Sequence, residues 1–336
     1  MLSAVDAGGT STRAVALDRT GTAHGYGRAG GGNPTSAGVD GAVSAIGAAV
    51  AAASATAPTA PAQQRDQVAL IAMAGVRSAE FRERLTARLA ALGVPQVVLS
   101  SDLLGIFGSG TYRQEGYVLI AGTGSIAARI AENRVERIVG GNGWLLGDDG
   151  SGFWVGHRVA RAVVAALDDA GPSTALTELL LGAVGLPVTP GSAGGRARAL
   201  SELVAHLYAQ RPVQLAALAP LPFTVPDDPV ARDILEQAAD ALAALLAVAR
   251  VSAVGGPVVA GGSVLVQGLL AGPPELRERL GLPTGTELVP VTDGVVGAAV
   301  LALREAGVDV DEALFARVQS EVARVQAAPP PQPTKR

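Results

Sequence analysis

The chain has 336 residues, enough for two domains, and its 49% apolar content is typical of a globular protein. Its net charge is −4 and it has no run of Lys or Arg, which argues against a nucleic-acid-binding surface. It has no Cys, and its only lysine is Lys335. Thiolate chemistry, iron–sulfur clusters, a lysine Schiff base and a P-loop are therefore excluded. Any phosphate group must be bound by backbone N–H groups, hydroxyls, arginine or a metal.

Neither a membrane span nor a signal peptide is expected from the sequence. No stretch of about 18 apolar residues is free of Gly, Pro and charge, so we expect no membrane span. The N-terminus has no basic segment followed by a long apolar one, so we also expect no signal peptide. These observations predict a soluble, cytoplasmic protein.

A Gly-rich turn between two short apolar runs opens the chain. Leu2 to Val5 and Ala14 to Leu17 are predicted strands, and the turn between them contains Gly8 and Gly9. Glycines without Cβ let phosphate oxygens approach backbone N–H groups, and the hydroxyls of Thr10 to Thr12 add donors. An ordinary hairpin with glycines at its turn is the alternative that this stretch leaves open.

Polar side chains flank this turn. Asp6 ends the first predicted strand, where its carboxylate can hold Mg²⁺ directly or through water. A third strand is predicted over Ala23 to Arg28, and the Gly-rich loop after it ends at Asn33. The Asn33 amide offers a donor and an acceptor to a polyhydroxy ligand, although a role within the turn is the simpler alternative.

The first half continues as alternating helices and strands. The predicted elements are a helix, a loop, a strand, a helix and a strand, at 39–54, 57–64, 68–73, 79–92 and 97–99. The order βββαβαβ indicates helices that cross between parallel strands. Asp102 follows the last strand at its carboxyl end, where ligands bind in open α/β sheets. It can act as a base there, or as the N-cap of the next helix.

The opening pattern recurs 114 positions later. Gly8 then falls on Gly122, and Ser11 falls on Ser125. The repeat predicts a second three-stranded unit with a second phosphate-binding turn. Ile120 stands in place of Asp6, so only the first turn has a carboxylate for a metal.

A glycine-dense loop at 140–152 follows the second unit. Its paired carboxylates suggest that Asp148 binds ligand hydroxyls, while Asp149 and Ser151 shape the start of a helix at 153–167. Two capping aspartates on a surface loop are the alternative.

The remaining elements complete the second half. Helices are predicted at 174–181, 197–208, 230–253, 293–304 and 309–325, and the last strand at 289–292. A strand, a Gly-Gly turn and a helix are predicted over 257–264, where glycines would let an adenine ring lie against the backbone.

Six motifs together resemble those of the acetate and sugar kinase/Hsp70/actin superfamily. Within it, the chain resembles the BadF/BadG/BcrA/BcrD ATPase family and its N-acetylglucosamine kinase branch. The motifs are Asp-Ala-Gly-Gly-Thr at 6–10, Gly-Gly-Asn at 31–33, Ser-Asp at 101–102, Gly-Thr-Gly-Ser at 122–125, Leu-Gly-Asp-Asp-Gly-Ser-Gly at 146–152 and Ala-Gly-Gly-Ser at 260–263. The first and fourth occur across the superfamily, whereas the fifth is far more discriminating. The departure is Asn142, where this branch usually carries Trp.

The resemblance implies an α/β protein with an actin-like ATPase (ribonuclease H-like) fold. Two related domains with mixed βββαβα sheets would surround a central cleft that holds ATP and a sugar. We expect a smaller domain of residues 1–112 plus about 306–326, a larger domain of residues 113–305, and a disordered tail at 327–336.

The resemblance also implies roles for individual residues. ATP would contact the Gly-rich turns, at Gly8, Gly9, Thr10, Ser11, Gly122, Thr123, Gly261, Gly262 and Ser263. The sugar would contact Asn33, Pro34, Asp102, Ser125, Gly141, Asn142, Gly143 and Asp148. Asp102 would be the catalytic base that takes the proton from the 6-hydroxyl, and Asp6 would hold the metal.

The expected function is an ATP-dependent amino-sugar kinase that phosphorylates the 6-hydroxyl of N-acetylglucosamine, with ATP and Mg²⁺ as cofactors. Glucosamine or N-acetylmuramic acid kinase is the nearest alternative. An ATPase that acts on a partner protein is the rival from another class, and a non-catalytic sugar sensor is a third. The expected partners are ATP and a small-molecule sugar, without nucleic acid or membrane, and a homodimer stays open.

Overall fold

The computed structural model describes residues 1–55, 68–74, 78–92, 96–187, 191–193, 195–250 and 254–328. The loop predicted at 57–64 and all but the first two residues of the predicted tail lie outside them. The chain divides into two compact units. The first contains Met1–Gly116, Ile130–Val135 and Asp293–Arg336, and the second contains Tyr117–Arg129 and Glu136–Thr292.

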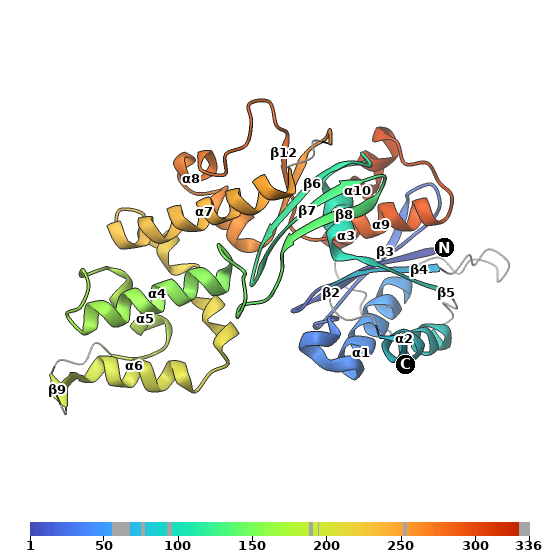
Figure 1. Cartoon of the computed structure of the whole chain (residues 1–336). Coiled ribbons are helices and arrows are strands. Elements are labelled where there is room, and N and C mark those ends of the chain that lie inside the picture. The colour runs from blue at the N-terminus through green and yellow to red at the C-terminus, as the bar shows by residue number, and fades with distance from the viewer. Residues whose placement is uncertain are drawn as a thin grey trace. The chain divides into compact units, whose positions relative to one another are not determined.

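The first unit is built on a five-stranded mixed sheet with the order β3-β2-β1-β4-β5 (Figure 1). Its strands are β1 (Leu2–Ala7), β2 (Thr12–Leu17), β3 (Ala23–Ala29), β4 (Val68–Met73) and β5 (Gln96–Ser101). The first three strands are antiparallel, and β4 and β5 continue the sheet in parallel with β1. The predicted strand order along the chain is confirmed.

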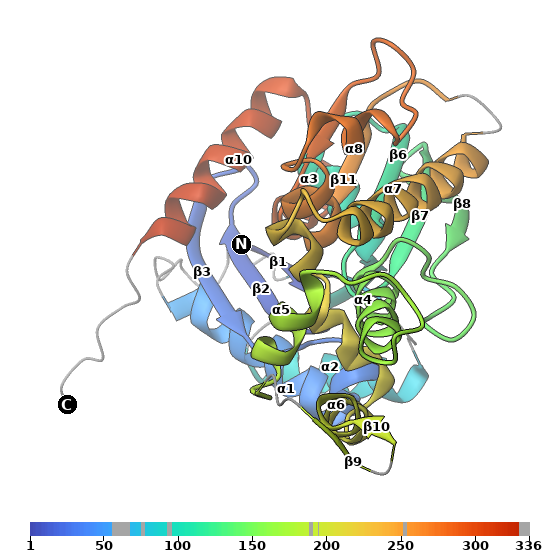
Figure 2. The ribbon, with the colours of Figure 1, turned by 90° about the vertical axis from the view of Figure 1, so that its left-hand side faces the viewer.

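Helices cover both faces of this sheet because successive strand residues point to opposite sides. Val5 and Ala7 face α1 (Pro34–Ala55) and α2 (Ala79–Ala91). Leu2 and Ala4 face α9 (Val295–Glu305) and α10 (Glu312–Ala327), and α3 (Asp102–Gly110) packs on α9. Figure 2 shows α10 beside β3.

Helix α1 is long and apolar enough, by composition, to cross a membrane. Its buried residues include Ala42, Ile46 and Val50, which pack into the core against the sheet. It therefore packs as a core helix of the first unit. A break at Gly38, with φ of 71°, separates a first turn from the continuous helix, which begins at the predicted Val39.

The second unit repeats the same sheet, with the order β12-β11-β6-β7-β8. Its strands are β6 (Gly116–Ala121), β7 (Ser125–Ala131), β8 (Arg134–Gly140), β11 (Val258–Gly261) and β12 (Leu288–Pro290). Strand β6 begins 114 residues after β1, and the antiparallel trio again joins two parallel strands. The duplication predicted from the two Gly-rich turns is confirmed.

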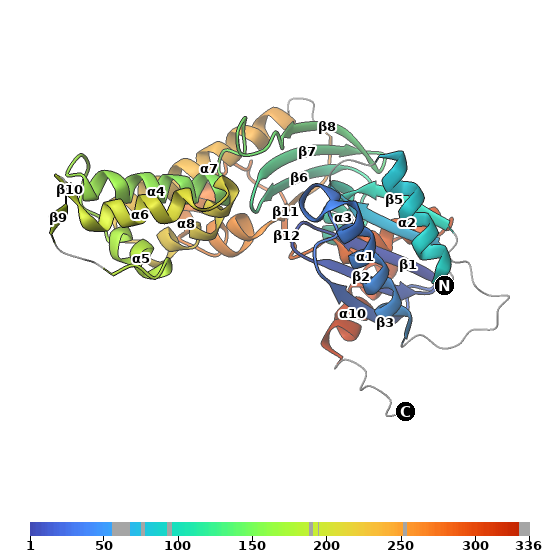
Figure 3. The same ribbon diagram turned by 90° about the horizontal axis from the view of Figure 1, so that it is seen from below.

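A helical segment separates β8 from β11 in the second unit. It contains α4 (Gly152–Leu167), α5 (Leu176–Ala183), the short strands β9 (Ser192–Ala193) and β10 (Arg196–Ala197), α6 (Arg198–Tyr208), the 3₁₀ helices η2 (Pro212–Leu218) and η3 (Leu221–Thr224), and α7 (Pro229–Ala249). The π-helix η4 (Val264–Leu269) and α8 (Pro274–Glu278) follow β11. Figure 3 shows α4, α5 and α6 grouped together, with α7 running from this group toward β8.

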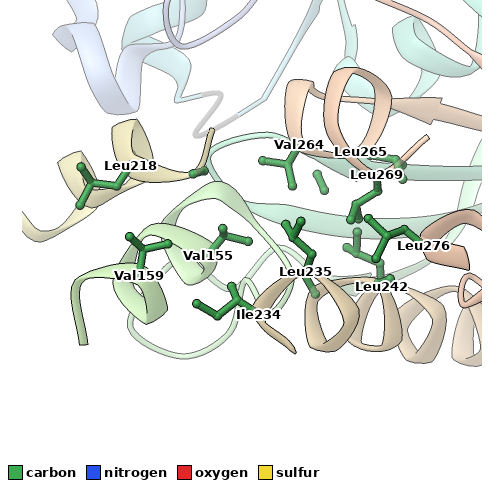
Figure 4. Close-up of a cluster of buried hydrophobic side chains, with 14 of the residues drawn as sticks. Val155, Val159, Leu218, Ile234, Leu235, Leu242, Val264, Leu265, Leu269 and Leu276 are labelled. Atoms are coloured by element: carbon green, nitrogen blue, oxygen red, sulfur yellow. The ribbon is translucent and has the colours of Figure 1, made fainter. Parts of the chain in front are cut away.

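The core of the second unit lies between these helices and the sheet. Val155 and Val159 from α4 pack with Leu235 and Leu242 from α7, and with Leu265 from η4 (Figure 4). All five side chains are almost fully buried. The segment after Ser263 was expected to be a helix, and it forms one with π-type hydrogen bonding.

Helix α9 lies in a different unit from the one that the expected domain boundaries give it. It falls in the range 113–305 expected for the larger domain, but it belongs to the first unit. Val295, Ala298 and Ala302 are buried in the first core. A Cβ at Gly297 would collide with the carbonyl oxygen of Gly105 on α3, so the two helices pack in backbone contact. Close packing of α9 against α3 at these glycines therefore holds α9 in the first unit.

Candidate active site

The first Gly-rich turn and the Gly-rich loop at 30–33 lie together in the first unit. The N–H of Gly8 donates to the Ser11 carbonyl at 3.0 Å, and the N–H of Gly32 donates to the Gly8 carbonyl at 3.0 Å. A Cβ at Gly31 would collide with the Gly9 carbonyl oxygen. These glycines therefore allow the two segments to touch along their backbones. Gly9 and Thr10 are exposed, whereas Ser11 is buried.

Asn33 joins this loop to α1, which begins at Pro34. Its side-chain oxygen accepts from the N–H of Thr35 at 2.8 Å, and its carbonyl accepts from Ser36 and Ala37. The role within the turn that the sequence left open is thus present. The capping contact uses Oδ1, so the Nδ2 donors of the amide are not spent on it.

Asp6 lies near the end of β1, next to several other charged side chains. Its Oδ2 accepts from the Gly294 N–H at 3.1 Å and lies 3.5 Å from Nη1 of Arg13. Burial raises its pKa to about 6, and the nearby carboxylates of Asp293 and Asp102 act in the same direction. The Gly294 N–H and Arg13 oppose this rise only in part.

Asp102 is the first residue of α3. Ser101 is the N-cap, since its Oγ accepts from the Leu103 N–H at 3.2 Å. The Oδ1 of Asp102 also accepts from this N–H, at 2.9 Å. The capping function is therefore shared. Asp102 follows the carboxyl end of β5, and Asp6 is the penultimate residue of β1. The two carboxylates interact electrostatically.

The second Gly-rich turn is fastened to the start of α4. The N–H of Gly152 donates to the Gly122 carbonyl at 2.7 Å, and the N–H of Phe153 donates to the Thr123 carbonyl at 3.1 Å. Ser125 is 2% exposed, and its hydroxyl donates to the Asp149 carbonyl at 2.7 Å. In this structure Ser125 holds the 140–152 loop in place, a role that the sequence did not indicate.

Asp148 is a buried carboxylate in a strained backbone position. Its φ is 62°, in the left-handed region that non-glycine residues rarely adopt. It accepts from the Ser125 N–H at 3.3 Å and also from the N–H of Gly143. Burial raises its pKa, and Asp149 adds to the rise. Strain of this kind is common where a side chain must be aimed at a ligand.

The predicted sugar-loop residues lie on the same closed loop as Asp148. Gly141 and Gly143 have φ of 69° and 82°, and Asn142 between them is exposed. The N–H groups of Leu146 and Gly147 both donate to the Gly143 carbonyl, at 3.1 and 3.0 Å. The loop therefore presents its exposed side chains on a hydrogen-bonded frame.

A cavity of about 370 Å³ opens beside the second turn. Its lining includes the predicted Gly122, Thr123 and Ser263, together with residues that the sequence analysis missed: Gly152, Ala216, Ala219, Pro220, Phe223, Thr224, Val264, Gln267 and Gly268. None of these is charged, and apolar surface of this kind suits the faces of a nucleobase. Gly262, with φ of 85°, makes backbone contact with Ala121 next to the cavity.

Most of the missed residues come from the short helices η2, η3 and η4, and Gly152 is the first residue of α4. A Cβ at Gly268 would lie 2.5 Å from Cζ of Phe223, so the ring packs directly on this glycine. The run Pro220 to Phe223 is the only pattern in the sequence near this wall of the cavity. Nothing in that run indicates that Phe223 packs on a residue about 45 positions later in the chain.

The charges around Asp6 fit a magnesium ion. Among the residues described, no three His, Cys, Asp or Glu side chains form a ready metal cluster. Mg²⁺ usually binds through one or two carboxylates, water and substrate phosphates, so a full protein cage is not required. The carboxylate of Asp6, whose pKa is raised by burial and neighbouring acids, suits a divalent cation.

Two mixed sheets of the same order, each with a Gly-rich turn after its first strand, define an actin-like ATPase fold. Within this class, the model of the BadF/BadG/BcrA/BcrD ATPase family matches residues 4–302. The chain belongs to that family.

Three related proteins are informative. N-acetyl-D-glucosamine kinase of Dictyostelium discoideum is 40% identical over 84 residues, which are 25% of this chain and 26% of that protein. N-acetylmuramic acid/N-acetylglucosamine kinase of Clostridium acetobutylicum is 32% identical over 108 residues, 32% of this chain and 35% of that protein. The matches thus span about a quarter and a third of these curated relatives.

A solved structure matches over a longer range. The crystal structure of a putative N-acetylglucosamine kinase from Chromobacterium violaceum is 28% identical, with a TM-score of 0.70. The alignment covers 90% of this chain and 98% of that one.

Proposed function

We propose that this protein is an ATP-dependent amino-sugar kinase that transfers the γ-phosphoryl group of Mg-ATP to the 6-hydroxyl of N-acetylglucosamine. The observation that carries the proposal is the pair of carboxylates at one edge of the first sheet. Asp6 near the carboxyl end of β1 suits a metal, and Asp102 after β5 suits a base. Family membership and the names of the three relatives support the same function.

The proposed catalysis is mainly positioning and charge stabilisation. Backbone N–H groups of the two Gly-rich turns, with Thr10 and Thr123, would hold the phosphates. The cavity beside Gly262 would hold adenosine. Mg²⁺, when bound, supplies positive charge to the phosphates, and Asp6 would hold it directly or through water.

The sugar would be bound by hydrogen-bonding side chains. Asn33 would bind its hydroxyls, and so would Asp148, which lies on the same loop as residues 141–143. Asp102 would orient the 6-hydroxyl and accept its proton as the oxygen bonds to the γ-phosphorus. The bond from that phosphorus to the bridging oxygen breaks, and ADP leaves.

A coupled ADP-release assay over a sugar panel tests the proposal. N-acetylglucosamine should give the largest kcat/KM, its 6-deoxy analogue should give no sugar-dependent ADP release, and ³¹P NMR should place the new phosphate on the 6-oxygen. ADP release that depends on no sugar in the panel would instead favour an ATPase that acts on a partner protein.

N-acetylmuramic acid is the second candidate substrate, because the Clostridium relative is named for both sugars. Its lactyl group is the difference that the panel measures.

We further propose a cytoplasmic location and a homodimer as the assembly, and light scattering of the purified protein tests the latter.

A further inference from the structure

One arginine bridges two carboxylates at the proposed metal site. Arg13 on β2 lies opposite Asp6 on β1 in the strand register. Its Nη1 lies 3.5 Å from Oδ2 of Asp6, and its Nε lies 3.3 Å from Oδ2 of Asp293. The proposed reaction assigns no role to Arg13 or Asp293.

Both carboxylates are anchored independently of Arg13. Asp6 accepts from the Gly294 N–H, and a Cβ at Gly294 would come within 3.0 Å of Oδ1 of Asp6. Oδ1 of Asp293 accepts from the Val295 N–H at 3.1 Å at the start of α9. The guanidinium is therefore the adjustable member of the group, lying between two fixed acids.

The charge balance leaves room for a divalent cation. Asp102 also interacts electrostatically with Asp6, so the carboxylate of Asp6 has two acidic neighbours and one guanidinium beside it. The side chains of Asp6 and Asp293 are 13% and 14% exposed, and that of Arg13 is 24% exposed. Charges this poorly hydrated interact more strongly than surface charges do. The excess of about two negative charges matches Mg²⁺.

We propose that Arg13 is a positioning residue that competes with the divalent cation for Asp6, and that Asp293 sets the outcome by holding the guanidinium. This inference rests on the proposed Mg-ATP site. In the metal-free protein Arg13 partly neutralises Asp6. When the metal arrives, Asp6 exchanges Arg13 for the cation, and Arg13 stays on Asp293. The long Asp6 contact makes this exchange easy.

The proposal predicts opposite effects from two neighbouring substitutions. Arg13→Met removes the competing charge, so the apparent Mg²⁺ affinity should rise on the order of tenfold. Asp293→Asn removes the anchor of the guanidinium, so Arg13 should bind Asp6 more tightly and Mg²⁺ affinity should fall by a similar factor. Asn retains the Oδ1 that accepts from the Val295 N–H. A merely structural role would weaken Mg²⁺ binding in both variants.

The experiment titrates MgCl₂ into the full chain at a fixed, saturating ADP concentration and follows the melting temperature, without sugar and without turnover. Arg28→Met is the matched control, because Arg28 is the strand partner of Arg13 on β3 and is exposed. It should leave the Mg²⁺ response unchanged. Arg13→Lys retains the charge and should stay near wild type.

The outcomes separate the two proposals. A rise in Mg²⁺ affinity for Arg13→Met and a fall for Asp293→Asn support the competition, and shifts of the same sign or no shifts overturn it. If Arg13→Met does not fold, Asp293→Asn decides alone, since unchanged or tighter Mg²⁺ binding contradicts the proposal. A wild-type protein without any Mg²⁺ response would overturn the metal site as well. Failure of the sugar panel alone would leave this result standing.

Discussion

At the scale of single residues, the site contains carboxylates that are costly to bury. Asp6 and Asp148 both have pKa values raised by burial, and Asp148 also has a left-handed backbone. Neither arrangement stabilises the ligand-free protein, because an ionised carboxylate is better hydrated in water. A metal beside Asp6 and hydroxyl donors beside Asp148 would offset that cost.

We expect Asp6→Asn to stabilise the ligand-free protein at neutral pH while it abolishes metal-dependent activity. The pKa of Asp6 rises from 3.8 to about 6 on folding. This group therefore favours the folded state fully below pH 3.8 and loses that contribution as pH rises through 6. Each pKa unit corresponds to about 1.4 kcal/mol, so Asn should gain up to about 3 kcal/mol at pH 7.5.

Chemical denaturation at several pH values checks this. The advantage of Asp6→Asn should shrink as pH falls from 6 to 4 and vanish below. A variant that is less stable than wild type at pH 7.5 would mean that the Arg13 contact outweighs the cost of burial.

Asp102→Asn should separate catalysis from capping. Ser101 caps α3, and Asn retains an Oδ1 for the Leu103 N–H, so the melting temperature should change little. Removal of a general base typically costs roughly 10²–10⁴ in rate, so kcat should fall by that factor. Calorimetric affinities for sugar and Mg-ATP should stay close to wild type. Near-normal turnover with lower stability would make Asp102 only a structural residue.

At the scale of elements, the loop from β8 to α4 depends on contacts with the β6–β7 turn. Asp148 can sit against this turn because residue 124 is Gly. A Cβ there would lie 2.8 Å from Oδ2 of Asp148. The hydroxyl of Ser125 holds the next residue of the loop by donating to the Asp149 carbonyl. Sugar binding is therefore expected to depend on Gly124, although this residue need not touch the sugar.

Gly124→Ala should displace the Asp148 carboxylate and weaken sugar affinity several-fold, with Mg-ATP affinity much less affected. Asp148→Ala should weaken sugar binding further, because a hydrogen bond to a charged group contributes about 1.5–3 kcal/mol. Gly182→Ala is the control, since a Cβ at this helical glycine in α5 meets nothing within 4 Å. Titration calorimetry measures each affinity. Equal losses for sugar and nucleotide would show that the turn is distorted as a whole.

At the scale of the whole molecule, the chain duplicates one sheet and then returns to the first copy. Helix α10 comes from the C-terminal part of the described chain and packs on β3, where Glu321 accepts from the Ala23 N–H at 3.1 Å. Phe315, Val318 and Val322 complete the first core. The first unit is thus finished only after the second has been synthesised.

Val318→Ala should destabilise the first unit by about 1–3 kcal/mol, because it opens a cavity in a fully buried position. Ser320→Ala on the exposed face of α10 is the control and should change stability little. Hydrogen exchange of β1 and β3 amides reports the loss locally. Unchanged protection of these strands would show that α10 adds little to this core.

The sequence by itself determined the strands, the two Gly-rich turns and their duplication. Each of these depends on a few consecutive residues, such as the apolar run at Leu2–Val5 and the glycines at 8 and 9. It also identified Asp6, Asp102 and Asp148 as carboxylates at strand ends or in a shaped loop. Local pattern is sufficient for such features because the side-chain periods of a helix and of a strand can be recognised in a short stretch of chain.

Only the tertiary structure decided which distant residues meet. The bridge from Asp6 through Arg13 to Asp293 joins residues almost 290 positions apart. Asp293 precedes α9, and this helix packs on α3 because Gly105 and Gly297 allow the two helices to touch. The cavity wall of Phe223 on Gly268 and the buried role of Ser125 are of the same kind. Such contacts depend on the fit of surfaces between elements, and no local pattern in the sequence encodes that fit.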